Sequence, residues 1–314
     1  MVTKFGVLAF SVAFVTPVAA LAQDFSGAVT LGYSHTDVPD ADIKLNGLSL
    51  DGRLDFSMGN GLTFGARYNT FNLDVAGIDA DVSGNLMAFD VTYDVSSAFS
   101  AGVFIEHAEL GVDIGGISLG SVASSNTFGI EGHYKTGAMD FGAFVATGEP
   151  GGLIAAGLAG VDLTHFGLSA TYTPSDALTV VGSFIRTNLD GGPLPTDVDI
   201  DYIGLAAVYD INDKFSVFGG LSRTKTDIVD LKATTISLGG SYDMSSFAGM
   251  PLMASLELAQ TKPELFGTDT DINSIRLGLT IPLGGNAAKA PLNSGADAIL
   301  NPSHSALSQT LLSF

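Results

Sequence analysis

Residues 48–57 read LSLDGRLDFS, and apolar and polar side chains alternate along the whole stretch. One set of alternate positions is Leu48, Leu50, Gly52, Leu54 and Phe56, and the other is Ser49, Asp51, Arg53, Asp55 and Ser57. Successive side chains of a β-strand point to opposite faces, whereas a helix would scatter both sets around its circumference. The stretch therefore predicts an amphipathic strand with one apolar face and one polar, charged face.

The same alternation recurs along most of the chain, for example in residues 87–94, 127–135, 165–172 and 274–283. Such runs predict about fourteen strands, with twelve or sixteen as alternatives. They cover roughly 25–36, 43–58, 62–74, 82–95, 99–111, 122–136, 139–149, 162–174, 178–188, 199–211, 215–226, 232–244, 252–262 and 271–283. The faces of 25–36 and 178–188 alternate too poorly to be assigned.

An aromatic residue precedes a short polar turn at regular intervals of 33 to 41 residues. These residues are Phe56, Tyr93, Tyr134, Tyr172, Tyr209 and Tyr242. Propellers and solenoids also repeat at such a period, but the alternation between the turns favours strand hairpins. Short turns that alternate with longer loops are typical of an all-β, transmembrane, antiparallel up-and-down β-barrel. We interpret the aromatic residues as its periplasmic girdle, with a soluble β-sandwich or secreted barrel as the alternative.

The N-terminus and the composition predict the compartment. Lys4, the apolar run from Phe5 to Val15 and the small residues around Leu21 are typical of a signal peptide over residues 1–22. After it, no stretch reaches the length of a membrane helix, although mean hydropathy is +0.36. The 33 acidic residues outnumber the 13 Lys and Arg, which argues against a nucleic acid partner. The chain has no Cys and therefore no disulfides or thiolate sites.

The final strand resembles the assembly signal of porin-like outer-membrane β-barrels of Gram-negative bacteria, and the overall pattern resembles that family over about 25–283. The residues that carry the signal are Arg276, Gly278, Ile281 and Leu283. The resemblance implies residence in outer-membrane lipid and contact with the barrel-assembly machinery. Ile281 and Leu283 stand where the family usually has aromatic residues, and about 30 residues follow the signal rather than none.

The chain therefore divides into a signal peptide (1–22), a barrel (23–285) and a C-terminal tail (286–314). The tail begins with an Ala-, Asn-, Gly- and Pro-rich stretch that is typical of a linker. Apolar residues from Ala306 to Phe314 then fall near helical spacing. A short helix in the periplasmic mouth of the barrel and a disordered end are both compatible with this pattern.

Barrels of 16–18 strands enclose an aqueous channel, and about fourteen strands lie nearer to that end of the range than to filled eight-stranded barrels. The inward positions are mostly small, as at Gly65, Gly129, Gly167, Ser169, Gly204, Ser237 and Gly278. We therefore expect an open, water-filled pore for passive diffusion of small hydrophilic solutes and ions. The segments 112–125 and 148–162 are the candidates for a loop that narrows it.

Charged residues on the inward faces predict the ion preference of the pore. The acids are Asp51, Asp55, Asp90, Glu106, Glu131 and Glu257, and the bases are Arg53, Arg67, Lys135 and Arg276. Their balance predicts weak cation selectivity. The alternative is that these charges only pair across strands and solvate the wall.

Other functions find less support in the sequence. His107, His133 and His165 fall on separate strands, and no nucleophile motif surrounds a serine, so we expect no enzyme. No cofactor or metal motif is present. A fatty-substrate transporter needs an N-terminal plug, for which the chain leaves no room. A non-conducting structural or adhesion barrel is the main alternative, and the strand count favours a monomer over a trimer.

Overall fold

The computed structural model describes residues 25–193, 197–227, 231–265, 268–284, 288 and 290–312. Strands that alternate in direction form one antiparallel sheet, and the sheet closes where β1 pairs with β15. The first half of the barrel consists of β1 (Phe25–Val38), β2 (Ile43–Met58), β3 (Leu62–Val75), β4 (Ala80–Asp94), β5 (Phe99–Ile114), β6 (Ile117–Thr136) and β7 (Met139–Gly151). The second half consists of β8 (Val161–Ser175), β9 (Leu178–Gly191), β10 (Val198–Asn212), β11 (Phe215–Thr226), β12 (Leu231–Asp243), β13 (Met253–Leu265) and β15 (Ile272–Gly284).

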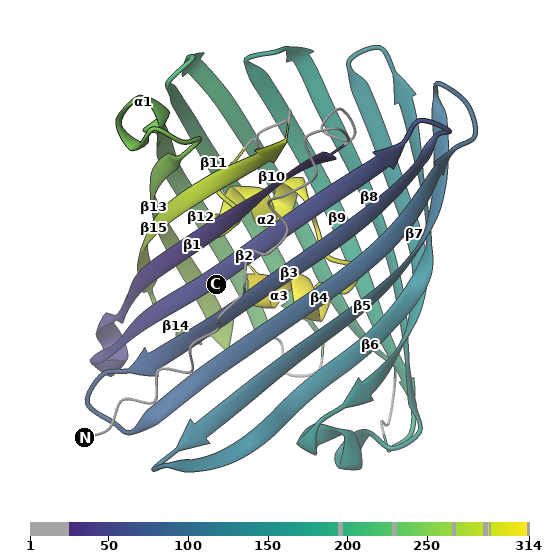
Figure 1. Cartoon of the computed structure of the whole chain (residues 1–314). Helices are drawn as coiled ribbons and strands as arrows, with labels where there is room; N and C mark the ends of the chain where they lie inside the picture. The colour runs from purple at the N-terminus through teal and green to yellow at the C-terminus, as the bar shows by residue number, and fades with distance from the viewer. Residues whose placement is uncertain are drawn as a thin grey trace.

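Each of these fourteen strands pairs with the strands before and after it in this order. The two-residue strand β14 (Thr268–Asp269) pairs only with the end of β13. The prediction of an all-β, up-and-down barrel of fourteen strands is confirmed (Figure 1). The predicted signal peptide, residues 1–22, lies outside the described residues.

The connections differ from the prediction in two places. The expected loop 112–121 is strand, because β5 and β6 continue to a tight turn at Gly115 and Gly116. Both glycines have positive φ values, 61° and 74°, which glycine adopts without steric cost. Conversely, the connection after β12 is long and contains the helix α1 (Ser245–Ala248), where a short turn was expected.

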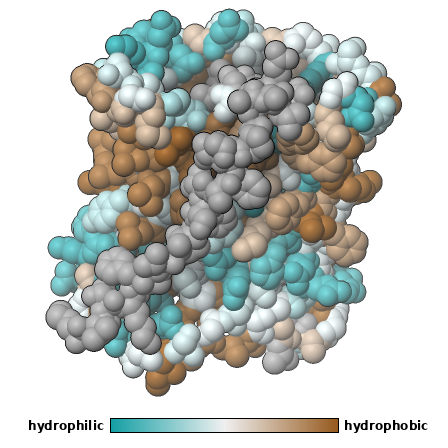
Figure 2. All heavy atoms as spheres, viewed as in Figure 1, coloured by the Kyte–Doolittle hydropathy of each residue, from teal (hydrophilic) through white to brown (hydrophobic). Residues whose placement is uncertain are grey.

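The outer surface of the barrel is apolar. Large hydrophobic side chains on alternate positions of neighbouring strands are about half exposed, as at Leu31, Ile105, Ile130 and Leu238. Figure 2 shows a hydrophobic band across the upper half of the visible face, with hydrophilic groups above and below it. No helix in the part of the chain that the structure describes is long and apolar enough to cross a membrane.

The predicted girdle residues lie at one end of the barrel, close to the short turns. Tyr134 pairs with Phe99 and Tyr242 pairs with Phe215, so aromatic residues of adjacent strands stand side by side at this edge. Tyr93, Tyr172 and Tyr209 are also exposed on the outer face. Their role at the lipid boundary stays a prediction.

The C-terminal segment lies inside the barrel, whereas the short helix considered from Ala306 onward was expected in the periplasmic mouth. It forms two short helices, α2 (Gly295–Leu300) and α3 (Ala306–Leu312), drawn in yellow within the ring of strands in Figure 1. Ala296, Ile299 and Ala306 are buried against inward side chains of β9, β10 and β11. The expected open pore is therefore occupied, and we call residues 290–312 the lumenal tail.

Candidate functional site

The lumenal tail crosses the lumen from wall to wall. Hydrogen bonds and ion pairs connect it to β1, β2, β3, β5, β6, β9, β11, β13 and β15. On the side of β9 to β11 the contact is apolar, and on the opposite side it is polar and charged. Neither of the predicted constricting segments has this role: 112–125 is mainly strand, and the 3-10 helix η3 (Leu153–Leu158) packs on β6 and β7.

Helix α2 begins with a local capping arrangement. Ser294 Oγ accepts a hydrogen bond from the Asp297 backbone N–H at 3.0 Å and donates to the Pro291 carbonyl at 2.7 Å. A serine in this position satisfies one of the free N–H groups at the start of a helix. The small residues Gly295 and Ala296 then allow the helix to lie close to the wall.

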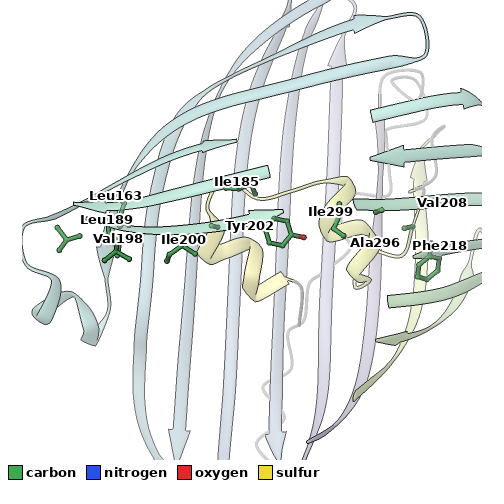
Figure 3. Close-up of a cluster of buried hydrophobic side chains, with 14 residues drawn as sticks. Leu163, Ile185, Leu189, Val198, Ile200, Tyr202, Val208, Phe218, Ala296 and Ile299 are labelled. Atoms are coloured by element: carbon green, nitrogen blue, oxygen red, sulfur yellow. The ribbon is translucent and has the colours of Figure 1, made fainter. Parts of the chain in front are cut away.

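Glycines in the barrel wall make room for Ile299 of α2. A Cβ atom added at Gly204 would lie 2.9 Å from Ile299, and one added at Gly220 would also lie 2.9 Å from it. Figure 3 shows Ile299 and Ala296 among strand side chains that include Tyr202, Val208 and Phe218. The small lumen residues that predicted an empty pore are therefore, at these positions, the space that the tail fills.

Two arginines of the wall hold α2 and the residue that follows it. Arg53 on β2 forms an ion pair with Asp297 at 2.9 Å, and the Asp297 carboxylate is almost fully buried. Arg67 on β3 donates a hydrogen bond to the Asn301 carbonyl at 2.6 Å. Hydrogen bonds with a charged partner are roughly twice as strong as neutral ones, so these contacts fix the exit of α2.

On the other side of the tail, Glu257 on β13 connects the barrel wall to α2. It accepts a hydrogen bond from Arg276 Nη1 at 2.7 Å and another from the Gly295 backbone N–H at 3.1 Å. The side chains of Glu257 and Arg276 are both less than a tenth exposed. Because a buried charge needs a partner, the pair and the tail are mutually dependent.

His304, between the two helices, lies between two carboxylates. Its backbone N–H donates to Glu106 at 3.0 Å, its Nδ1 lies 3.2 Å from Glu106, and its Nε2 lies 3.5 Å from Glu131. Its ring stacks on Phe104 at a centroid distance of 3.5 Å, with the edge contact of Phe144 at 5.0 Å. Burial alone would lower the pKa of His304, but the hydrogen bonds with Glu106 and Glu131 raise it to about 9.

Raising the pH through about 9 is therefore expected to loosen the tail. A pKa raised above its ordinary value of 6.5 means that proton binding favours the docked tail, fully below about pH 6.5 and no longer above about pH 9. The chain has no Cys, so a Ser308→Cys variant carries one thiol, at a position that is 1 % exposed. Its labelling by a hydrophilic maleimide should accelerate between pH 7 and pH 10.

The thiol itself reacts faster at high pH, so the control is the same variant with His304→Gln. That control should label quickly at both pH values, apart from the thiol's own pH dependence. Identical pH profiles for the two variants would contradict the role of His304.

Most of the predicted pore-lining residues lie around the tail. The residues that contact the tail directly or through one partner are Arg53, Arg67, Glu106, Glu131, Glu257 and Arg276. Asp51 bonds instead to Ser49 and Asn69 on the wall. Lys135 is exposed near the short turn after β6, 3.8 Å from Asp140.

A cavity of about 250 Å³ lies between the tail and the wall. Its charged lining includes Asp55, Asp90, Glu131, Arg53 and Arg67, and the tail contributes residues 300–302 and His304. The lining therefore combines these charged groups with apolar side chains such as Phe144 and Leu168, and the charged groups can hold water or hydrophilic solutes.

The sequence contains a signal that the lumen is occupied, which the prediction of an open pore did not use. The inner faces of β9 and β10 carry Ile185, Leu189, Ile200, Tyr202 and Val208. A water-filled lumen would be lined by polar residues, so an apolar inner face indicates that another segment packs there. Asp297 and His304, which anchor the tail, have no local signal that identifies their partners.

The histidines considered for catalysis lie apart in the structure. His107 contacts Asn126, His133 contacts Asp140, and His165 contacts Thr187. Within the described ranges, no three His, Cys, Asp or Glu side chains are grouped as a metal site requires.

The fold and the lumen define a membrane β-barrel of the channel type whose own C-terminal segment occupies its interior. The sequence matches the family model of the Gram-negative porin over residues 50–228. The chain therefore belongs to this porin family and lies in the outer membrane of a Gram-negative bacterium. No curated protein sequence matches it significantly.

Solved structures of similar fold include hydrocarbon channels. A TodX mutant, a monoaromatic hydrocarbon channel, has a TM-score of 0.54 and 10% identity, covering 88% of this chain and 94% of its own. The CymD monoaromatic hydrocarbon channel has a TM-score of 0.51 and 13% identity, covering 87% and 92%. A Pseudomonas aeruginosa FadL homologue has a TM-score of 0.50 and 13% identity, covering 84% and 92%. At these identities the likeness concerns the fold alone.

Proposed function

We propose that this chain is an outer-membrane channel for passive diffusion of small hydrophilic solutes and ions, and that docking of the lumenal tail closes it. The observation that carries the proposal is the nature of the tail contacts. Charged side chains of the wall, among them Arg53, Glu106 and Glu257, bind the tail through a few directed bonds. When the tail leaves, water can solvate these groups, so the open state keeps a hydrated, charged wall opposite the apolar inner faces of β9 to β11.

The charges support a weak preference for cations in the open state. Around the tail and the cavity the wall carries Asp51, Asp55, Asp90, Glu106, Glu131 and Glu257 against Arg53, Arg67 and Arg276. An excess of carboxylates raises the local concentration of cations. A reversal potential under a salt gradient gives the sign of the selectivity.

Two alternatives remain to be compared with this proposal, the first by the experiment below and the second by the lining of the cavity. A non-conducting structural or adhesion barrel would keep the tail docked permanently. The hydrocarbon channels named above share the fold, but the cavity beside the tail in this chain has a charged lining that disfavours hydrocarbons. The charged groups in the lining are what favour hydrophilic solutes here.

A reversible tether tests the proposal in the full chain. Thr224 Oγ1 on β11 lies 3.1 Å from Thr310 Oγ1 on α3, so a Thr224→Cys/Thr310→Cys variant places two thiols within bonding reach. In a planar bilayer, the oxidised variant should be silent, and reduction should restore discrete openings. Equal currents in both states, or silence of the reduced protein, would contradict closure by the tail.

The matched control is Thr235→Cys/Thr261→Cys. These hydroxyls lie 2.9 Å apart on β12 and β13, so the disulfide stays within the wall and leaves the tail free. Its oxidation should not change the current.

Four further assignments belong to this proposal. Residues 1–22 act as a cleaved signal peptide, and Arg276, Gly278, Ile281 and Leu283 on β15 contact the barrel-assembly machinery. The aromatic residues near the short turns act as the periplasmic girdle. The barrel works as a monomer.

A further inference from the structure

The tail presents a carboxylate, a backbone carbonyl and a histidine ring to the lumen wall. The Asp297 carboxylate lies on Arg53, the Asn301 carbonyl lies on Arg67, and the His304 ring lies between Glu106 and Glu131. An anion and a cation of one peptide segment are thus held at two separate places on the same wall. Each is held by side chains of opposite charge.

The strand register sets the two places. Arg53 and Arg67 are cross-strand partners on β2 and β3, and we call this pair the basic end of the wall. Glu106 and Glu131 form its acidic end. Arg67 pairs with Ala88 on β4, and Ala88 pairs with Glu106 on β5. Because neighbouring strands lie about 5 Å apart, the basic and acidic ends are separated by about 10 Å along the ladder. The small Ala88 leaves the space between them open.

We infer that this wall is a binding site for small zwitterions, such as amino acids and short peptides, and that the lumenal tail occupies it as a built-in substitute. The inference rests on the proposed function and names its substrate class. The solute's carboxylate binds Arg53 and Arg67, and its ammonium group binds Glu106 and Glu131. The solute and the tail therefore compete.

Two features show that the tail leaves part of this site unfilled. The cavity of about 250 Å³ is lined by Arg53, Arg67, Glu106 and Glu131 together. Arg53 Nη1 is buried and has no hydrogen-bond partner in the described part of the chain. A buried donor without a partner is costly, and an incoming carboxylate would satisfy it.

Competition requires both charges of the solute. A solute with only a carboxylate replaces Asp297 but leaves Glu106 and Glu131 without a cation once His304 departs. A solute with only an ammonium group leaves Arg53 and Arg67 without an anion. Leaving one member of such a pair unsatisfied costs more than the pair gains, so singly charged solutes displace the tail poorly.

The test uses the full-length Ser308→Cys protein and its labelling rate at pH 7. The four probes have the same backbone: glycylglycine, its N-acetyl derivative, its amide, and its N-acetyl amide, which are zwitterion, anion, cation and neutral molecule. We expect glycylglycine alone to accelerate labelling, in a saturable manner and by about tenfold, as is typical of coupled sites. Arg53→Gln in the same background removes the ion pair with Asp297, so it should label rapidly without solute and show no further response to glycylglycine. Arg186→Gln, on the outer face, should preserve both the slow basal labelling and the response.

Asp297→Ala in the Ser308→Cys background is the positive control, because loss of the Arg53 ion pair should release the tail without any solute. If this control labels rapidly while glycylglycine has no effect, the inference is wrong. Equal acceleration by all four probes also overturns it. Labelling does not require conduction, so a zwitterion-specific response from a barrel that never conducts would support the site and reject the channel.

Discussion

Deletion of residues 290–314 is expected to convert a closed barrel into a conducting one. The lumenal tail contacts opposite sides of the barrel wall, and its removal leaves small and charged residues on one side and the apolar inner faces of β9 to β11 on the other. Fourteen strands then enclose a lumen nearer to that of aqueous porins than to that of filled eight-stranded barrels. Planar-bilayer recording at equal protein-to-lipid ratio should show large, stable steps for the truncated chain and mostly closed behaviour for the full-length chain.

The truncated barrel must be shown to be folded, for which a shift in electrophoretic mobility on heating is suitable. A folded but silent truncated barrel would remove the channel from consideration. The structural or adhesion function would then take its place.

Glu257→Ala is expected to have the largest effect of any single substitution on tail docking. It removes a carboxylate that pairs with the Arg276 guanidinium, 7% exposed, and it removes the acceptor of the Gly295 N–H. Breaking a buried ion pair costs roughly 3–5 kcal/mol. Undocking relieves this cost because lumen water then reaches Arg276, so the undocked fraction should rise roughly a hundredfold or more.

Thiol labelling of Ser308→Cys measures this fraction. Glu257→Gln keeps an acceptor for the Gly295 N–H and should have a smaller effect than Glu257→Ala. Glu109→Ala, an exposed position on β5, is the matched control and should leave the rate unchanged. A rate that is the same for Glu257→Ala and Glu109→Ala would show that Glu257 does not hold the tail.

The barrel was predictable from the sequence because its determinants are local. Alternation such as that from Leu48 to Ser57 fixes which face is apolar, and the turn residues between runs fix where each hairpin ends. The two departures, at Gly115 and Gly116 and at α1, concern how long a connection is. The length of a connection depends on packing at the rim as much as on local sequence.

The position of the lumenal tail was not predictable in the same way, because the residues that bind it are distant in sequence. Arg53 and Asp297 are 244 residues apart, and Glu106 and His304 are 198 apart. The same small residues, such as Gly204 and Gly220, fit both an empty lumen and a lumen filled by a helix. Only the apolar inner faces of β9 and β10, around Ile185 and Tyr202, favoured a lumen filled by a helix.

The position of the tail on the seam of the barrel has a consequence for biogenesis. The Leu292 N–H donates to Thr30 on β1, and the neighbouring Asn293 donates to the Leu277 carbonyl on β15. Thr30 is itself bonded to Thr280 across the same seam. The first and last strands must therefore meet before this part of the tail finds its complete set of partners. Complete docking of the tail is therefore a late step of assembly, and it depends on closure of the ring.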